Sequence, residues 1–195
     1  MRVGRVERKT AETEIALVFG LDGTGRQAID TNVPFLDHML AQLSRHGILD
    51  LEVQARGDTI IDYHHTVEDI GICLGQALGR ALADGAGIRR FGHAIAPLDE
   101  ALVLVSIDIS GRGYASVSLQ FGSPKVGQFD TELVAEFLQA FALNVPLTLH
   151  VMQLRGQNAH HVAEATFKAL GLALREAVSL DPRRPDLPST KGALL

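Results

Sequence analysis

The feature that most constrains this chain is a short motif, two adjacent histidines followed by a carboxylate, which occurs twice. The first copy spans His64–Glu68, and the second, 96 residues later, spans His160–Glu164. Each copy opens a segment whose apolar residues recur at helical spacing, so we expect both motifs in the first turns of a helix. Matching residues follow both copies, with Leu74-Gly75 corresponding to Leu170-Gly171. A repeated motif in repeated surroundings indicates an internal duplication.

The duplication extends through most of the chain. The segment Glu14–Arg26 matches Glu100–Arg112 at an offset of 86 residues. A later segment aligns at an offset of 98 residues, which places Glu136 opposite His38. We therefore predict one domain, residues 1–195, made of two repeats at about 1–89 and 90–180 and a tail at 181–195. The tail is rich in proline, which does not fit a helix interior, so we expect an extended arm.

Hydrophobic periodicity and turn residues predict a mixture of strands and helices. The predicted strands cover about residues 3–9, 14–21, 49–53, 114–121 and 147–154, together with a repeat of the second strand beginning at Glu100. The predicted helices cover about residues 34–47, 64–83, 131–144 and 160–178. Since predicted strands precede every helix, an α+β fold of two similar halves is favoured over a helical bundle.

Composition and charge limit which binding partners and which cellular compartment are expected for this chain. The net charge of -5 argues against a nucleic-acid or anionic-membrane surface. The first ten residues contain no apolar segment typical of a secretory signal, and no apolar run reaches the length of a membrane span. Cys73 is the only cysteine, so no disulfide within the chain is possible and a buried structural thiol is expected. We expect a soluble, cytoplasmic protein.

The spacing of the motif points to metal chemistry. Adjacent residues on a helix point about 100° apart, while residues i and i+4 lie nearly above one another. His64 and Glu68 can therefore share one ion, while His65 must face elsewhere. A single buried pair of histidines is more often structural, but two copies with a carboxylate at the same spacing favour ligands for two metal ions. Imidazole and carboxylate without thiolate suit manganese, iron, cobalt or zinc.

Several further segments resemble the signatures of one enzyme family. Besides the two histidine motifs, they are Pro34–Leu40, Arg90–Gly92, Ala96–Ala101, Ser110–Arg112 and Ser189–Gly192. Together they resemble imidazoleglycerol-phosphate dehydratases from about Arg8 to Gly192. Many members have Asp at the position of Tyr63, and some have a metal-binding His at the position of Glu136.

The resemblance implies a fold, an activity and an assembly. The fold is that of two similar halves of the ribosomal protein S5 domain 2-like type. The activity is a lyase step of histidine biosynthesis, the dehydration of D-erythro-imidazoleglycerol phosphate to imidazoleacetol phosphate. The cofactor is manganese, with two Mn²⁺ ions per active site. The assembly is a homo-oligomer, a 24-subunit shell built from trimers with sites at subunit interfaces.

The resemblance also assigns roles to residues. The implied metal ligands are His38, His64, His65, Glu68, Glu136, His160, His161 and Glu164. The implied catalytic residues are Glu12, His38, Glu68 and Glu164, with Glu12 orienting or deprotonating the substrate. The implied residues for the substrate and its phosphate are Glu12, Arg90, Arg112, Lys168, Ser189 and Lys191. Without the resemblance, each of these cations reads as an ordinary surface charge.

Our mechanistic hypothesis is that the two ions bind the substrate ring as imidazolate and that a general base removes the neighbouring proton. Each histidine pair would then be split, with His161 joining His64 and Glu68, and His65 joining His160 and Glu164. Three other histidines, His46, His93 and His150, are left outside the site. Two other classes remain open, a dimetal oxidase or hydrolase and a metal-dependent storage shell.

Overall fold

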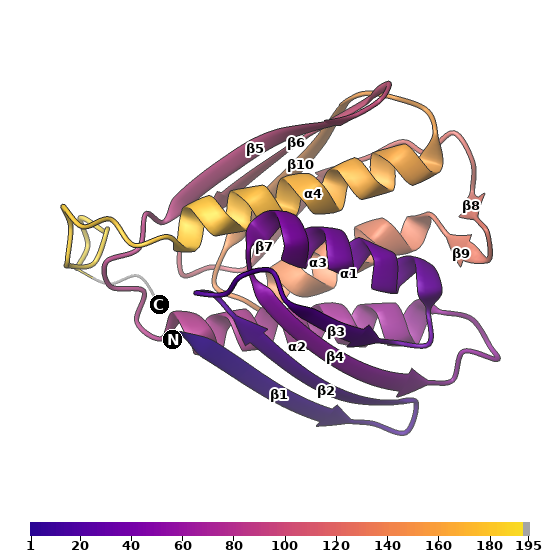
Figure 1. Cartoon of the computed structure of the whole chain (residues 1–195), viewed down its shortest axis with the longest axis horizontal. Helices are drawn as coiled ribbons and strands as arrows, with labels where there is room; N and C mark the ends of the chain where they lie inside the picture. The colour runs from indigo at the N-terminus through magenta and orange to yellow at the C-terminus, as the bar shows by residue number, and fades with distance from the viewer. Residues whose placement is uncertain (193–195) are drawn as a thin grey trace.

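The computed structural model describes residues 1–192, so the last three residues of the predicted tail lie outside the described part. It forms two halves with the same order of elements (Figure 1). The first half contains β1 (Val3–Lys9), β2 (Thr13–Gly20), β3 (Gln27–Asp30), α1 (Pro34–Gly47), β4 (Asp50–Gly57) and α2 (His64–Leu82). The second contains β5 (Phe91–Leu98), β6 (Ala101–Asp108), β7 (Tyr114–Ser118), β8 (Lys125–Val126), β9 (Phe129–Asp130), α3 (Glu132–Leu143), β10 (Thr148–Arg155) and α4 (Ala159–Val178). The predicted α+β class with two similar halves is confirmed.

Both halves use the same sheet topology. The strand orders are β1-β2-β4-β3 and β5-β6-β10-β7. In each sheet the first three strands are antiparallel, and the last pair, β3 with β4 or β7 with β10, is parallel. A parallel pair needs a crossover connection, which α1 and α3 provide. The hairpin of β8 and β9 departs from this shared order, because it lies between β7 and α3.

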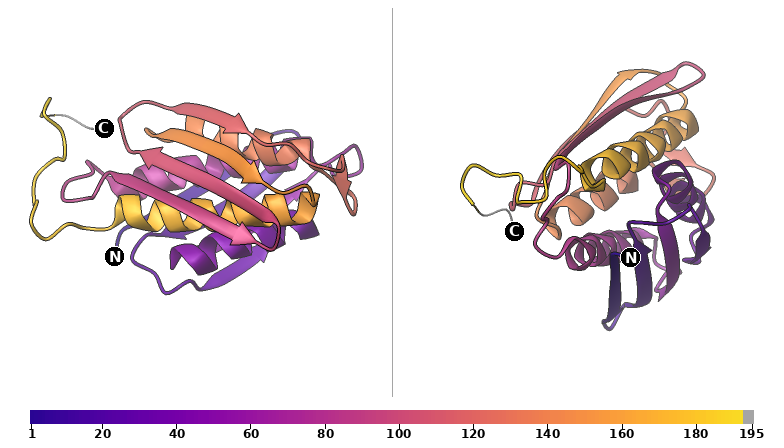
Figure 2. Two further views of the ribbon diagram at one scale, coloured as in Figure 1. Left: turned by 90° about the horizontal axis from the view of Figure 1, so that it is seen from above. Right: turned by 60° about the vertical axis from the view of Figure 1, so that its left-hand side comes forward.

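The four helices lie between the two sheets (Figures 1 and 2). Alternate residues of β2 and β6 are buried against the helices, as the period of a strand requires. Helix α2 packs on α3, and α4 packs on α1. The two helices that carry the histidine motifs therefore have different main partners. None of the helices among the described residues is both long and apolar enough to cross a membrane.

The sequence missed four strands and misplaced the end of a fifth. Two of the missed strands, β8 and β9, have only two residues each, too few to show a hydrophobic pattern. Strand β3 is short and mostly exposed, so it shows little hydrophobic alternation. Strand β5 contains Gly92 and Pro97, residues that are typical of strand ends and turns. His93 therefore lies on a strand. Strand β7 ends at Ser118, three residues before the predicted end.

The tail forms no helix among its described residues, and backbone contacts hold it against the connection between the halves. Leu180 pairs with Ile88, and the backbone N–H of Gly87 donates to the Asp186 carbonyl (3.0 Å). The Arg90 side chain donates to the Pro188 carbonyl at 2.9 Å. The arm is therefore anchored as far as Pro188, and it lies at the end of the molecule where α4 finishes (Figure 1).

Candidate active site

A side chain just before each histidine motif accepts hydrogen bonds from backbone N–H groups at the start of the helix. Two residues before the first histidine stands Asp62 in one half and Asn158 in the other. The Asp62 carboxylate accepts a hydrogen bond from the His64 backbone N–H at 2.7 Å. The Asn158 side chain accepts from His160 N–H at 3.0 Å and His161 N–H at 3.3 Å. These side chains satisfy N–H groups that a helix start leaves unpaired, and they fix the histidines in the first turn.

A group of three potential ligands forms where α1 packs on α4. The Nε2 atoms of His38 and His160 each lie 3.1 Å from Oε2 of Glu164. Their ligand atoms all lie within 4.8 Å of one another, as a shared ion requires. Two imidazole nitrogens and one carboxylate oxygen fit manganese, iron, cobalt or zinc and leave positions open for substrate.

Hydrogen bonds from neighbouring side chains keep the Glu164 carboxylate negatively charged. Burial by itself would raise the pKa of this carboxyl group, but hydrogen bonds from Lys168, His38 and His160 lower the pKa to about 2. The Lys168 ammonium lies 2.7 Å from Oε1 of Glu164, one helical turn along α4. The carboxylate is therefore ionised at neutral pH, the form in which it binds a metal.

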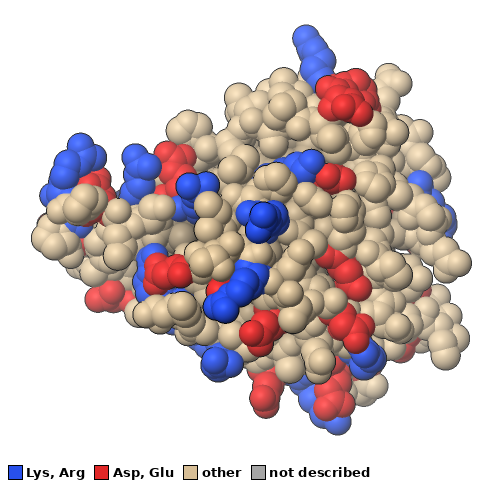
Figure 3. All heavy atoms as spheres, in the orientation of Figure 1, with Lys and Arg blue, Asp and Glu red and all other residues tan. Residues whose placement is uncertain are grey.

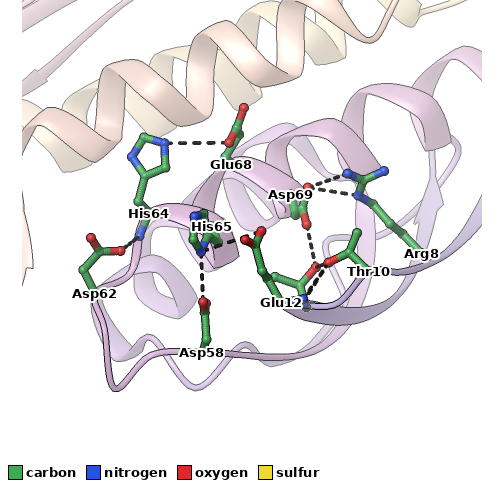
Figure 4. Close-up of polar contacts among 10 residues, drawn as sticks. Arg8, Thr10, Glu12, Asp58, Asp62, His64, His65, Glu68 and Asp69 are labelled. Atoms are coloured by element: carbon green, nitrogen blue, oxygen red, sulfur yellow. Dashed lines mark hydrogen bonds and ion pairs between the residues drawn. The ribbon is translucent and has the colours of Figure 1, made fainter.

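The equivalent group on α2 is more open (Figure 4). His64 Nε2 lies 3.7 Å from Oε2 of Glu68, again at a spacing of one helical turn. Glu136, at the position equivalent to His38, lies on α3, which packs on α2. Over residues 1–192 the structure records no side-chain hydrogen bond or ion pair for Glu136, so the chain brings three of the predicted ligands together where α1 packs on α4 and two together on α2.

The second histidine of each motif faces away from the first, as helical geometry predicts. His65 Nδ1 lies 3.0 Å from Oδ2 of Asp58 and 3.8 Å from Oε2 of Glu12 (Figure 4). His161 Nδ1 lies 2.8 Å from Oε2 of Glu100. These hydrogen bonds with Asp58 and Glu100 raise the pKa values of His65 and His161. Neither carboxylate was predicted from the sequence, because no motif marks them: Asp58 follows β4, and Glu100 lies in a turn distant in sequence from His161.

A polar network supports the turn that carries Glu12 (Figure 4). The Thr10 hydroxyl accepts hydrogen bonds from the backbone N–H groups of Glu12 (3.1 Å) and Thr13 (2.9 Å). The Thr13 hydroxyl donates to the buried Asp69 carboxylate at 2.5 Å, and Arg8 donates to the same carboxylate at 2.9 Å. The network fixes the turn between β1 and β2 and keeps the Glu12 carboxylate on the same side as His65.

The predicted phosphate-binding residues fall into two groups. Lys168 lies beside the His38 group. The others are at the opposite end, where Arg90 pairs with Asp108 (2.7 Å) and Arg112 contacts the Ser110 carbonyl. Ser189 and Lys191 follow on the tail. Because α4 has 20 residues, its length is about 30 Å, which separates the tail from His160 in the same chain.

An apolar hollow adjoins the His38 group. It has a volume of about 590 Å³, and its lining includes Phe35, Tyr63 and Phe129 together with His38 and His160. The ring of Phe35 meets the His160 ring edge-on, with centroids 5.3 Å apart. This packing orients the imidazole and gives the site one water-poor wall.

On the face drawn in Figure 3, acidic and basic side chains are interspersed.

Comparisons with known proteins agree on one family. The family model for imidazoleglycerol-phosphate dehydratase matches residues 31–174. The chain is 57% identical over 193 residues to imidazoleglycerol-phosphate dehydratase of Moorella thermoacetica, covering 99% of this chain and 98% of the relative. It is 54% identical over 195 residues to that of Prochlorococcus marinus, covering 100% and 97%.

Two crystal structures share the fold. The dehydratase of Pyrococcus furiosus superposes with a TM-score of 0.84 at 42% identity, covering 97% of this chain and 100% of that one. The dehydratase of Staphylococcus aureus gives 0.83 at 39% identity, covering 92% and 99%. The chain therefore belongs to the imidazoleglycerol-phosphate dehydratase family and is a hydro-lyase of histidine biosynthesis.

Proposed function

We propose that this chain converts D-erythro-imidazoleglycerol phosphate to imidazoleacetol phosphate at a site with two manganese ions. The observation that carries the proposal is the group of His38, His160 and Glu164, whose ligand atoms lie within 4.8 Å of one another. Its approximate repeat at His64 and Glu68 supports a second ion. Bound there, the ions would hold the ring nitrogens of the substrate and favour its imidazolate form, which promotes departure of the hydroxyl group on the adjacent carbon.

The residues of the chain then divide the remaining tasks. The reaction removes a proton from one carbon and hydroxide from its neighbour, so water is released. Glu12 is the proposed proton acceptor or orienting group, because its carboxylate extends from a supported turn beside His65. Arg90, Arg112, Lys168, Ser189 and Lys191 are the proposed phosphate contacts, with arginine binding as a bidentate fork and lysine as a point charge.

A complete site needs more than one chain. The tail follows the C-terminal end of α4, a helix about 30 Å long, so Ser189 and Lys191 lie at the opposite end of the chain's fold from His160, beyond the reach of a small substrate (Figure 1). We propose that the tail of one subunit supplies phosphate contacts to the metal groups of another. His65 and His161 point away from their own motif partners, which supports ligand sharing between subunits as well.

The outer surface of the second sheet supports a homo-oligomer. Ile95, Leu104 and Met152 are aligned across β5, β6 and β10, and Ile95 and Met152 are each 52% exposed. A row on the exposed face of the first sheet, across β1, β2 and β4, consists of Glu7, Ala16 and Gln54 and is mostly polar. An exposed apolar row is typical of a surface covered by another subunit. The proposed assembly is the 24-subunit shell built from trimers that is expected of the family.

The deciding experiment is turnover of imidazoleglycerol phosphate by the purified protein, with metal content measured in the same sample. Chelation should abolish activity, and manganese should restore it better than magnesium, because imidazole ligands disfavour an ion that prefers oxygen. Full activity after verified loss of metal would contradict the metal mechanism. A protein that binds metal and assembles but never turns over substrate would instead support the storage shell.

A further inference from the structure

Two carboxylates outside the histidine motifs make equivalent contacts, one with the second histidine of each motif. Asp58 follows strand β4, and Glu100 lies in the turn between β5 and β6. The Asp58 carboxylate lies 3.0 Å from Nδ1 of His65, and the Glu100 carboxylate lies 2.8 Å from Nδ1 of His161. The two carboxylates come from different elements, yet they meet the same ring atom of the second histidine.

This contact selects one form of the imidazole ring. A carboxylate accepts hydrogen bonds and cannot donate one when ionised, so each contact requires a proton on Nδ1. In the neutral ring the lone pair is then on Nε2, which can bind a metal ion. Over residues 1–192 no hydrogen bond is recorded to Nε2 of His65 or His161, and the Asp99 carboxylate lies 3.9 Å from Nε2 of His161, beyond hydrogen-bond distance. The other proposed histidine ligands on α1 and α4 agree, because His160 and His38 also direct Nε2 toward Glu164.

The carboxylates are themselves held in place. The second oxygen of Glu100 accepts the backbone N–H of Asn158 at 3.0 Å, so Glu100 links the cap of α4 to the His161 ring. The backbone N–H of Asp58 donates to the Glu12 carbonyl at 3.1 Å. Glu12 is less well placed to fix the His65 ring itself, because its carboxylate is 3.8 Å from Nδ1.

We propose that Asp58 and Glu100 are positioning residues, each accepting a hydrogen bond from Nδ1–H of the second histidine and presenting Nε2 to a metal ion. The inference rests on the proposed metal-dependent function, and it assigns roles to residues that do not bind the metal themselves. Such partners fix the tautomer and the ring orientation, and their loss typically weakens metal binding by about 10–100-fold. His65 and His161 are proposed to bind different ions. Asp58 should therefore affect the affinity for one ion, and Glu100 the affinity for the other.

The test is manganese titration of the metal-free full-length protein, with affinity measured for each ion. Asp58→Leu should weaken one ion by about 10–100-fold and leave the other unchanged, and Glu100→Leu should do the reverse. Asp58→Asn and Glu100→Gln keep an oxygen acceptor, so they should restore part of the loss. In a His65→Gln background, Asp58→Leu should have no further effect, because the ring that it positions is absent.

Glu176→Gln is the matched control, because Glu176 lies 3.5 Å from Nδ1 of His93, a histidine outside the site. It should leave both affinities unchanged. Wild-type affinity at both ions in the Asp58 and Glu100 variants would overturn the inference, as would equal weakening of both ions by one substitution. A wild-type protein that binds no manganese would overturn the proposed function first, and this inference with it.

Discussion

At the scale of single residues, the packing of α2 controls the chemistry of Cys73. The side chain is fully buried, and burial is the main cause that raises the pKa of its thiol to about 11. The thiolate is the reactive form of cysteine, so a neutral buried thiol is inert. We predict that Cys73 does not react with a thiol reagent at pH 8 in the native protein and reacts fully once urea unfolds it. Rapid modification under native conditions would contradict the burial.

The same shift gives a dependence of stability on pH. The thiol of the unfolded chain ionises near pH 9.0, whereas the folded thiol stays protonated up to about pH 11. Because the folded pKa is the higher one, its contribution to stability is complete below pH 9.0 and is lost as pH rises toward 11. Urea denaturation at several pH values should show a smaller loss over this range in Cys73→Ala than in wild type. Equal losses in both proteins would show that other groups cause it.

At the scale of elements, glycines determine how closely the helices pack. A Cβ at Gly75 of α2 would lie 2.5 Å from the Phe141 carbonyl oxygen of α3. Gly171, at the equivalent position of α4, would meet the Leu43 carbonyl of α1 at the same distance of 2.5 Å. The same close approach of two helices at a glycine therefore occurs twice, once for α2 and α3 and once for α4 and α1. It brings His38 on α1 close to the motif on α4 and places Glu136 on the helix that packs against α2.

Two glycine-to-alanine substitutions on α2 distinguish the effect of this close packing on the free energy of unfolding from the effect of helix propensity. Gly75→Ala forces the backbones apart and should lower the free energy of unfolding by roughly 1–3 kcal/mol. Gly79→Ala has only Pro146 nearby at 3.7 Å, so it should raise that free energy by up to about 1 kcal/mol. Denaturant unfolding of both variants measures the difference. A stabilised Gly75→Ala protein would mean that the interface between α2 and α3 can widen freely.

At the scale of the whole molecule, the helix starts that carry the histidine motifs and the tail that is proposed to bind phosphate lie at opposite ends (Figure 1). If the tail serves another subunit, two inactive variants should complement each other. We predict that His65→Ala and Lys191→Ala are each nearly inactive alone and that their coexpression restores activity. Mixed assemblies then contain sites with an intact His65 from one chain and an intact Lys191 from another. No recovery in assemblies shown to contain both chains would place these residues in the same subunit's site.

Metal removal should also affect the assembly. If His65 and His161 bind ions held by a neighbouring chain, those ions link subunits, and chelation should loosen the complex into smaller units. Light scattering of metal-free and manganese-loaded protein measures this change, with His65→Ala and His161→Ala tested alongside. A metal-free protein that keeps the full mass would contradict metal-driven assembly without affecting the dehydratase assignment.

The sequence by itself determined the features that depend on local period and on repetition. Apolar spacing located all four helices to within a few residues, and the matching offsets revealed two similar halves. The spacing of His64, His65 and Glu68 also determined that the first histidine faces the glutamate and the second faces away. That divergence is a property of the helix itself. Strands β3 and β5 were missed because sheet neighbours stabilise them more than their own residues do.

Only the tertiary structure decided which distant residues meet. Nothing in the local sequence pairs His65 with Asp58 or His161 with Glu100, because each contact depends on how a turn folds over a helix end. The packing of α1 on α4 brings His38 to within 3.1 Å of Glu164, although 126 residues separate them. The long helix α4 likewise separates the tail from the proposed metal ligands. Local patterns specify elements, whereas a site depends on contacts between elements, which only the packed core fixes.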